Sequence, residues 1–112
     1  MSHFLKDKAA IAGIGLTEFS KKSGVSELPG EGIEAQTREA LSRVQTLLES
    51  VGSDKSRMLQ VIIWLKSMEH FNAMNEIWEE WVPEGAAPAR ACGQSALASD
   101  DLLVEFTVTA AL

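Results

Sequence analysis

The chain has little of several residue types, and each shortage argues against a class of protein. It holds a single cysteine, Cys92, so no disulfide can form within the chain. Ten lysines and arginines stand against sixteen aspartates and glutamates, which gives a formal charge of −6. Nucleic-acid binding requires clustered cations and is therefore not expected. No apolar run reaches the roughly 18 residues of a membrane span, so we expect no contact with a membrane.

What the chain does contain is typical of one folded domain, residues 1–112, since 46% of its residues are hydrophobic. The apolar run at residues 9–16 is interrupted by glycines and leads to no cleavage site, so no export signal is expected. Together with the lone cysteine, this pattern favours a cytoplasmic location. A domain of this size has a thin core, and burial between subunits would stabilise it.

Two amphipathic helices are predicted from apolar residues that recur at steps of three and four. The first begins at Ile33 and ends before Gly52, which suits a position of positive φ. Its apolar side consists of Ile33, Thr37, Ala40, Leu41, Val44, Leu47, Leu48 and Val51. The second covers residues 68–82, with Ser67 as N-cap and Pro83 at its end. Its apolar side consists of Phe71, Met74, Trp78 and Trp81.

Four further segments are predicted as strands, namely residues 9–16, 58–66, 89–97 and 102–110. In the second of them one face is formed by Leu59, Val61, Ile63 and Leu65, and the other by Ile62 and Trp64. Both faces are apolar, so both need cover, and the helices of one small domain cover only one. A second subunit is the simplest cover for the other. The element order predicts an α+β fold with two helices packed on one face of a β-sheet.

Two charged residues stand out by their positions in the last two strands. Arg90 lies at the start of one, and Glu105 lies inside the other, which is otherwise largely apolar. A charge in such a strand is costly unless it is paired, hydrated or at an interface. One interpretation is a structural Arg–Glu pair between neighbouring strands. The other sets Arg90 to grip a carboxylate ligand bidentately, with the carboxylate of Glu105 acting on water or a proton.

Familiar metal and cofactor motifs are missing. His3, His70 and Cys92 are too few and too widely spaced for a metal site. Gly13 and Gly15 lack the third glycine and the following helix of a dinucleotide fingerprint, and no G-x-S-x-G elbow is present. We therefore expect neither a metal nor an organic cofactor.

Residues 32–111 resemble the RidA family (reactive intermediate deaminases, formerly YjgF-like), in particular its short, YoaB-like members. The matching motifs come in the family's order and are I-E-A-Q-T-R-E-A-L, V-I-I-W-L-K-S-M, F-x-x-M-N-E-I-W, P-A-R-A-C and L-L-V-E-F-T-V-T-A-A. The resemblance implies a chorismate-mutase-like fold. It also implies a homotrimer whose sheets form a central barrel, with ligand clefts between the subunits.

The resemblance further implies an activity, the hydrolysis of reactive 2-imino and 2-enamino acids to 2-oxo acids and ammonia without a cofactor. Arg90 would then bind the substrate carboxylate, and Glu105 would position or activate the attacking water. Cys92, Asn75 and Gly24 would line the cleft, Cys92 as an apolar wall residue rather than a nucleophile. Two alternatives stay open. One is a non-catalytic trimer of the same fold that binds small carboxylates, and the other is a ribonuclease or translation inhibitor, which the acidic charge disfavours.

The first 24 residues depart from the family pattern and look like the start of a thiolase-type protein, with A-I-x-G-I-G-x-T-x-F from Ala10 onward. The family has a hairpin here that ends in an S-G-Q-like turn. Either residues 23–25, which could form a further short strand, supply that turn, or residues 11–14 supply the strand and a longer loop follows. Gly93 and Gln94 also replace residues that are commonly β-branched and acidic in the family.

Overall fold

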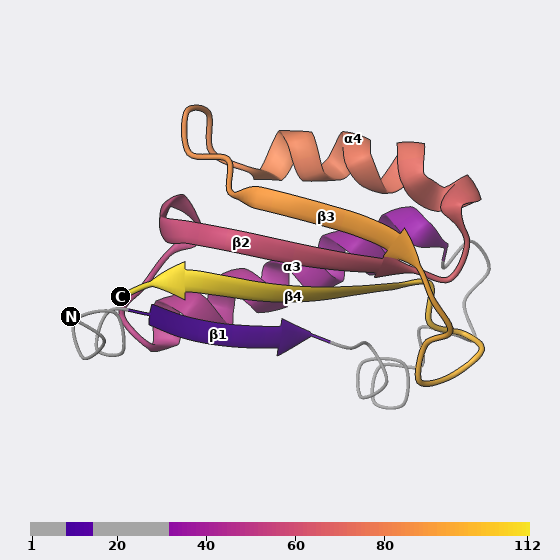
Figure 1. The fold of residues 1–112 in the computed structure, drawn as a ribbon, viewed down its shortest axis with the longest axis horizontal. Coiled ribbons are helices and arrows are strands. Elements are labelled where there is room, and N and C mark those ends of the chain that lie inside the picture. Colours follow the sequence, from indigo (N-terminus) through magenta and orange to yellow (C-terminus); the bar gives the residue numbers. More distant parts are fainter. Residues whose placement is uncertain (1–8, 15–31) are drawn as a thin grey trace.

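The computed structural model of the protein describes residues 9–14 and 32–112. Its elements follow in the order β1 (Ala9–Ile14), α3 (Ile33–Ser50), η2 (Lys55–Arg57), β2 (Met58–Leu65), η3 (Met68–His70), α4 (Phe71–Trp81), β3 (Ala89–Gln94) and β4 (Val104–Ala111). The strands form one sheet in the order β1-β4-β2-β3. Strand β4 runs antiparallel to β1 and β2, whereas β2 and β3, which are joined through α4, run parallel. In Figure 1 the strands lie in front of α3, and α4 runs along the β3 side of the sheet.

Helix α3 begins and ends where the sequence predicts. The N–H of Gln36 donates to the carbonyl of Gly32, and Gly52 adopts a φ of +84° just beyond the helix. The predicted apolar side is buried except for Leu47 and Val51, which are 42% and 53% exposed, so the prediction is wrong for these two. Leu47 lies about 100° around the helix from the buried Leu48, and Val51 follows the last helical residue.

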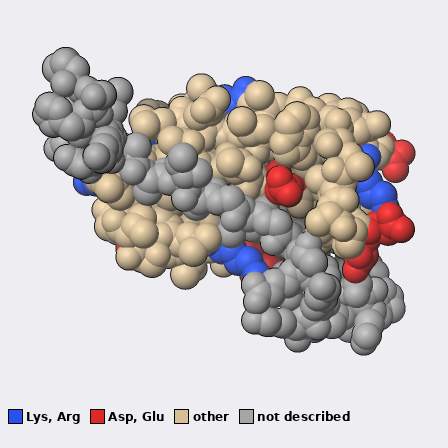
Figure 2. All heavy atoms as spheres, turned by 60° about the horizontal axis from the view of Figure 1, so that its bottom comes forward, with Lys and Arg blue, Asp and Glu red and all other residues tan. Residues whose placement is uncertain are grey.

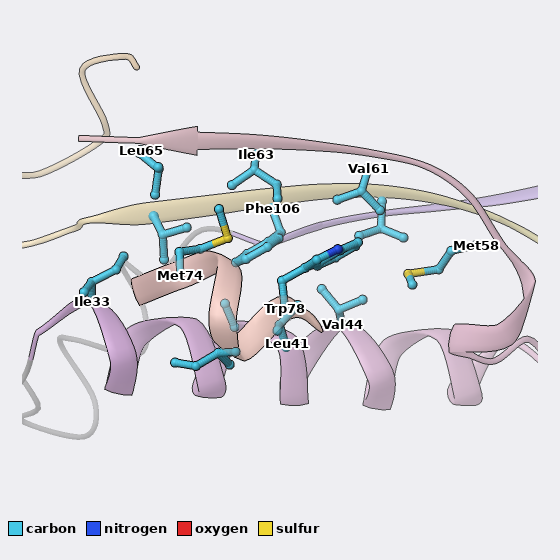
Figure 3. Packing of buried hydrophobic residues seen from close by; sticks show 14 of the residues in the cluster. Ile33, Leu41, Val44, Met58, Val61, Ile63, Leu65, Met74, Trp78 and Phe106 are labelled. Carbon is cyan, nitrogen blue, oxygen red and sulfur yellow. The ribbon is translucent and has the colours of Figure 1, made fainter. Parts of the chain in front are cut away.

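The core lies between the helices and one face of the sheet (Figure 3). Trp78 of α4 reaches into it, and its ring stacks on Phe106 of β4 with centroids 6.3 Å apart. The largest fully buried side chains are Phe106, Leu41, Leu48, Ile63, Leu65, Met74, Val44, Val61, Val104, Val108 and Thr37. Each large apolar side chain buried here contributes about 1.5–3 kcal/mol to folding. This layer fixes α4 against β2 and β3, where the candidate site lies.

Strand β2 has the predicted alternation from Val61 onward, but not at its start. Val61, Ile63 and Leu65 are buried and Trp64 is 39% exposed, as the two-faced pattern predicts. The alternation places Leu59 on the face of Val61, Ile63 and Leu65, yet it is 53% exposed, and Met58 is buried in its place. The register against β4 shifts between Met58 and Gln60, and an irregularity of this kind turns the residues before it to the opposite face.

The second predicted helix begins with a different geometry. Ser67 caps it as expected, its Oγ accepting from the N–H of Glu69. The first turn, Met68–His70, is however 3₁₀, and the α-helix proper starts at Phe71. Ile77 was absent from the predicted apolar side and is 5% exposed, because it faces α3 rather than the sheet.

The other face of the sheet carries no helix among the described elements. Along β4, Val104, Phe106, Val108 and Ala110 are buried, whereas the alternate residues are only half-buried. In Figure 2, which tips the lower edge of the sheet forward, most described atoms on view are uncharged, and an acidic group stands among them. The α+β class with both helices on one face is thus confirmed, whereas the trimeric barrel stays a prediction.

The structure describes only one of the two N-terminal segments for which the sequence leaves alternatives. Residues 11–14 lie in β1, which pairs with β4 from Ala9 opposite Ala111 to Ile14 opposite Phe106. The strand alternative therefore holds for these residues, whereas residues 23–25 lie outside the described part of the chain. No described helix is long and apolar enough to cross a membrane.

Candidate active site

Arg90 lies at the second position of β3, an edge strand of the sheet. It is in register with the buried Val61 of the parallel neighbour β2, so its side chain leaves the sheet on the side of the helices. There its Nη1 donates to Oδ1 of Asn75 on α4, with 2.6 Å between the two atoms. The structure thus brings together two of the predicted site residues that are 15 positions apart in the chain.

Two aromatic rings of α4 flank the same guanidinium. Its central carbon lies 5.8 Å from the ring centroid of Phe71 and 5.5 Å from that of Trp78. Phe71, Asn75 and Trp78 are four and three residues apart, which places them on one side of the helix. Such cation–π contacts hold a cation without neutralising it. Among the described residues, no aspartate or glutamate forms an ion pair with Arg90.

Cys92 follows Arg90 on the same face of β3 and is half-buried. Burial raises the pKa of its thiol, and the nearby positive charge of Arg90 opposes this only in part. The thiol therefore stays protonated near neutral pH. Because only the thiolate is a strong nucleophile, Cys92 is a weak nucleophile here. This fits the predicted role of a wall residue. Gly24, the remaining predicted lining residue, lies outside the described residues.

Glu105 lies on the opposite face of the sheet. It is the partner of Trp64 in the β2–β4 register, and Trp64 points away from the helices. Strand β2 separates β4 from β3, so the two charged residues are two strands apart, or about 10 Å. Their positions along β2 differ by three residues, which adds about 10 Å along the strands. The Cα atoms are thus roughly 14 Å apart with the sheet between the side chains, and the interpretation as a structural pair of neighbouring strands is wrong.

Two further contacts, one at this site and one at the far end of β3, are not among those predicted. Asn75 uses its Nδ2 to donate to Oε1 of Glu79, 3.2 Å away, and Gln94 accepts from the N–H of Met68 at 2.9 Å. The spacing of four residues between Asn75 and Glu79 on a predicted helix was the available signal for the first contact. The second joins the end of β3 to the start of η3, and no sequence pattern indicates it.

Two hollows lined by described residues lie elsewhere. A groove of about 410 Å³ runs between α3 and α4, and a cavity of about 330 Å³ lies beside the loop that follows β3. Neither has Arg90 or Glu105 in its lining. Within the described residues no cluster of three potential metal ligands occurs. Arg90 is an exposed residue of the edge strand β3.

The motifs around Arg90 and the two-layer fold can be compared with known proteins. Residues 6–112 match the model of the family described as Endoribonuclease L-PSP. The chain belongs to this family. It is the family that also carries the names RutC, YjgF and RidA, as the sequence motifs predict. The match begins at residue 6 and thus includes the strand β1.

Named relatives show how far the likeness extends. A RutC family protein of Haemophilus ducreyi is 38% identical over 77 residues, which are 69% of this chain and 66% of the relative. The RutC family protein YoaB of Escherichia coli is also 38% identical over 77 residues, 69% of this chain and 68% of the relative. The matched part thus spans about two thirds of the length of these relatives.

Solved structures of the family share the fold. A YjgF family member from Neisseria meningitidis is 37% identical, with a TM-score of 0.67, and the match covers 67% of this chain and 63% of that protein. A structure from Salmonella typhimurium, described as a putative translation initiation inhibitor, is 38% identical with a TM-score of 0.69 and covers 70% and 69% of the two chains. The two-helix, single-sheet architecture is therefore that of the YjgF family.

Proposed function

We propose that the chain is a RidA-like deaminase that hydrolyses reactive 2-imino and 2-enamino acids to 2-oxo acids and ammonia. The observation that supports this is the state of Arg90, a cation held at 2.6 Å by a neutral amide and flanked by two rings, with no described carboxylate paired to it. A guanidinium in that state offers its remaining N–H groups to a carboxylate in a fork. The substrates carry a carboxylate on the carbon that reacts, so this grip also positions the reacting carbon.

The chemistry needs a water and a proton acceptor. An enamine first takes a proton on carbon and loses one from nitrogen, which gives the imine. The oxygen of water then bonds to the imine carbon while one water proton passes to the nitrogen, which gives a carbinolamine. The remaining hydroxyl proton passes to the nitrogen as the carbon–nitrogen bond breaks and the carbonyl forms, so ammonia and the 2-oxo acid are released. We assign Glu105 to hold that water and to accept its proton before passing it to the leaving nitrogen.

This assignment requires a second copy of the chain, because Arg90 and Glu105 lie on opposite faces of one sheet. We propose the homotrimer with a central barrel and clefts between subunits. The open sheet face supports it. Trp64 is 39% exposed on this face, and Leu59 is 53% exposed near the start of β2. Covering such apolar area stabilises an assembly. In that arrangement the β3 edge of one subunit meets the open face of its neighbour.

The test is turnover of imines made in place by an amino acid oxidase, followed as release of the 2-oxo acid. The wild-type chain should accelerate release, and Arg90→Ala should lower kcat/KM on the order of 100-fold, because a charge-assisted fork contributes about 3 kcal/mol. Arg57→Ala is the matched control, since Arg57 is a surface arginine whose ion-pair partner is Asp54, away from the site. If Arg90→Ala and Arg57→Ala were equally active, the assigned role of Arg90 would be wrong.

The same experiment separates the second candidate, a non-catalytic trimer that binds small carboxylates. Gly93 and Gln94 favour it, because they replace the β-branched and acidic residues common in the family next to the site. Binding of a 2-oxo acid through Arg90 without any acceleration of imine hydrolysis would establish this alternative. The endoribonuclease activity in the family's description has no such support here, since the net charge of −6 opposes binding to an RNA backbone.

A further inference from the structure

Helix α4 carries two adjacent glutamates that face different parts of the molecule. Glu79 accepts from Nδ2 of Asn75, with 3.2 Å between the atoms, and so lies on the side of Arg90. Glu80 lies 3.6 Å from Nη1 of Arg38 and faces helix α3. The two carboxylates are alike in type, both are exposed and they are one residue apart, but only one of them is connected to the candidate site.

The connection passes through the amide of Asn75, which can be turned in two ways. Only its oxygen can accept from Arg90, because a guanidinium has donors and no acceptor. A carboxylate has acceptors and no donor, so Glu79 binds the NH₂ group and not the oxygen. With Nδ2 bound to Glu79, Oδ1 points to Arg90, and both hydrogen bonds are made in the same amide orientation.

We propose that Glu79 is a positioning residue of the carboxylate site, which acts on Arg90 through Asn75. This inference rests on the proposed function, in which Arg90 grips the substrate carboxylate. Glu79 fixes the amide, the amide fixes one edge of the guanidinium, and the opposite edge is left facing the ligand. The side chain of Asn75 lies between the carboxylate of Glu79 and Arg90. The negative charge therefore orients and polarises the amide without occupying the N–H groups of Arg90 that would bind the ligand.

Ligand affinity should therefore depend on Glu79 and not on Glu80. Glu79→Ala should weaken binding of pyruvate, used as the probe 2-oxo acid, about fivefold, the effect of losing one ordinary hydrogen bond. In turnover the loss should fall on KM, with kcat little changed, because Glu79 does not touch the reacting atoms. Glu79→Gln keeps an oxygen that accepts from Asn75 and should restore most of the affinity. Glu80→Ala, the matched control, should bind pyruvate like the wild type.

A double-mutant cycle tests whether the effect passes through the amide. In an Asn75→Ala background, Glu79→Ala should cause no further loss of pyruvate affinity, because the connection is already broken. A general effect of Glu79 on the helix or on the local charge would instead add its full fivefold loss in that background. Full additivity would overturn the proposal, as would equal effects of Glu79→Ala and Glu80→Ala.

Side-chain NMR of the ligand-free protein gives a readout that needs no substrate. Glu79→Ala should shift the Asn75 amide signals and the Nε–H signal of Arg90, whereas Glu80→Ala should move neither. Unchanged Arg90 signals in Glu79→Ala would overturn the inference. If the wild type neither binds pyruvate nor turns over imines, the proposed function fails, and the NMR result still decides whether Glu79 positions Arg90.

Discussion

Two inactive variants of this chain should restore each other's activity when they assemble together. One variant is Arg90→Ala, which removes the carboxylate grip, and the other is Glu105→Gln, which removes the proposed proton acceptor. Each alone should be inactive, because every cleft lacks one of the two groups. We expect recovery when the two chains are unfolded, mixed in equal amounts and refolded together.

The expected recovery follows from the sheet. Arg90 leaves β3 on the helix side, Glu105 leaves β4 on the open side, and their Cα atoms are roughly 14 Å apart, from the strand spacing and the rise per residue. No small acid can touch both groups of one chain, so each cleft takes Arg90 from one chain and Glu105 from a neighbour. In a random mixture half of the chains keep Arg90 and half keep Glu105. About a quarter of the clefts in a cyclic trimer are then complete, and activity should reach about a quarter of the wild-type value.

The assay is release of 2-oxo acid from imines generated by an amino acid oxidase. Native mass spectrometry of chains carrying tags of different mass shows whether mixed trimers have formed. Each variant refolded alone supplies the background rate. If mixed trimers formed and activity stayed at that background, the two residues would not share a cleft between subunits, and the division of roles proposed for them would be refuted.

Three further outcomes are expected. Gln36 is 4% exposed and bonds to the carbonyl of Asp101 and the N–H of Leu103, just before β4, at 2.8 Å each. Gln36→Leu should therefore cost about 3 kcal/mol in urea unfolding followed by tryptophan fluorescence, and a change below about 0.5 kcal/mol would contradict this. A Cβ on Gly93 would lie 3.1 Å from the ring of Trp64. Gly93→Ala should therefore destabilise the wild type by about 1 kcal/mol but should not destabilise a Trp64→Ala background. Equal effects in both backgrounds would show that the ring is not the obstacle. Burial raises the pKa of Cys92, so iodoacetamide should react with it more slowly than with glutathione and gain speed only at more alkaline pH, whereas faster reaction would mark a nucleophile.

The helices and the interior of the strands could be predicted because their burial follows simple periods. Most residues of α3 that recur at steps of three and four, and the residues of β4 that recur at steps of two, are buried, whereas Leu47 and Val51 are exposed. The start of β2 could not be predicted, since the register shift before Gln60 depends on how β2 pairs with β4 and leaves no mark on the alternation. The burial of Gln36 is likewise not predictable from the helical period. Its buried position is stabilised by backbone groups more than 60 residues away in the chain.

The candidate site was predictable in its residues but not in its arrangement. Arg90 and Glu105 stand out because charges interrupt apolar strands, and the motifs around them carry the family likeness. Strand order is not encoded in the spacing between them, so the sequence is compatible both with a structural pair and with a ligand grip. The strand order β4-β2-β3 places β2 between the two residues. Arg90 instead bonds to Asn75 of α4. The rings of Phe71 and Trp78 around the guanidinium likewise follow from the packing of α4 on the sheet.

The role of Arg90 is tested most directly by calorimetric titration of a small 2-oxo acid into wild type, Arg90→Ala and Arg90→Lys. We expect the wild type to bind, Arg90→Ala to lose binding, and Arg90→Lys to fall between them, because lysine keeps the charge but not the planar fork. Equal affinity in all three proteins would show that the acid binds elsewhere or without this side chain, and the proposed site would be wrong.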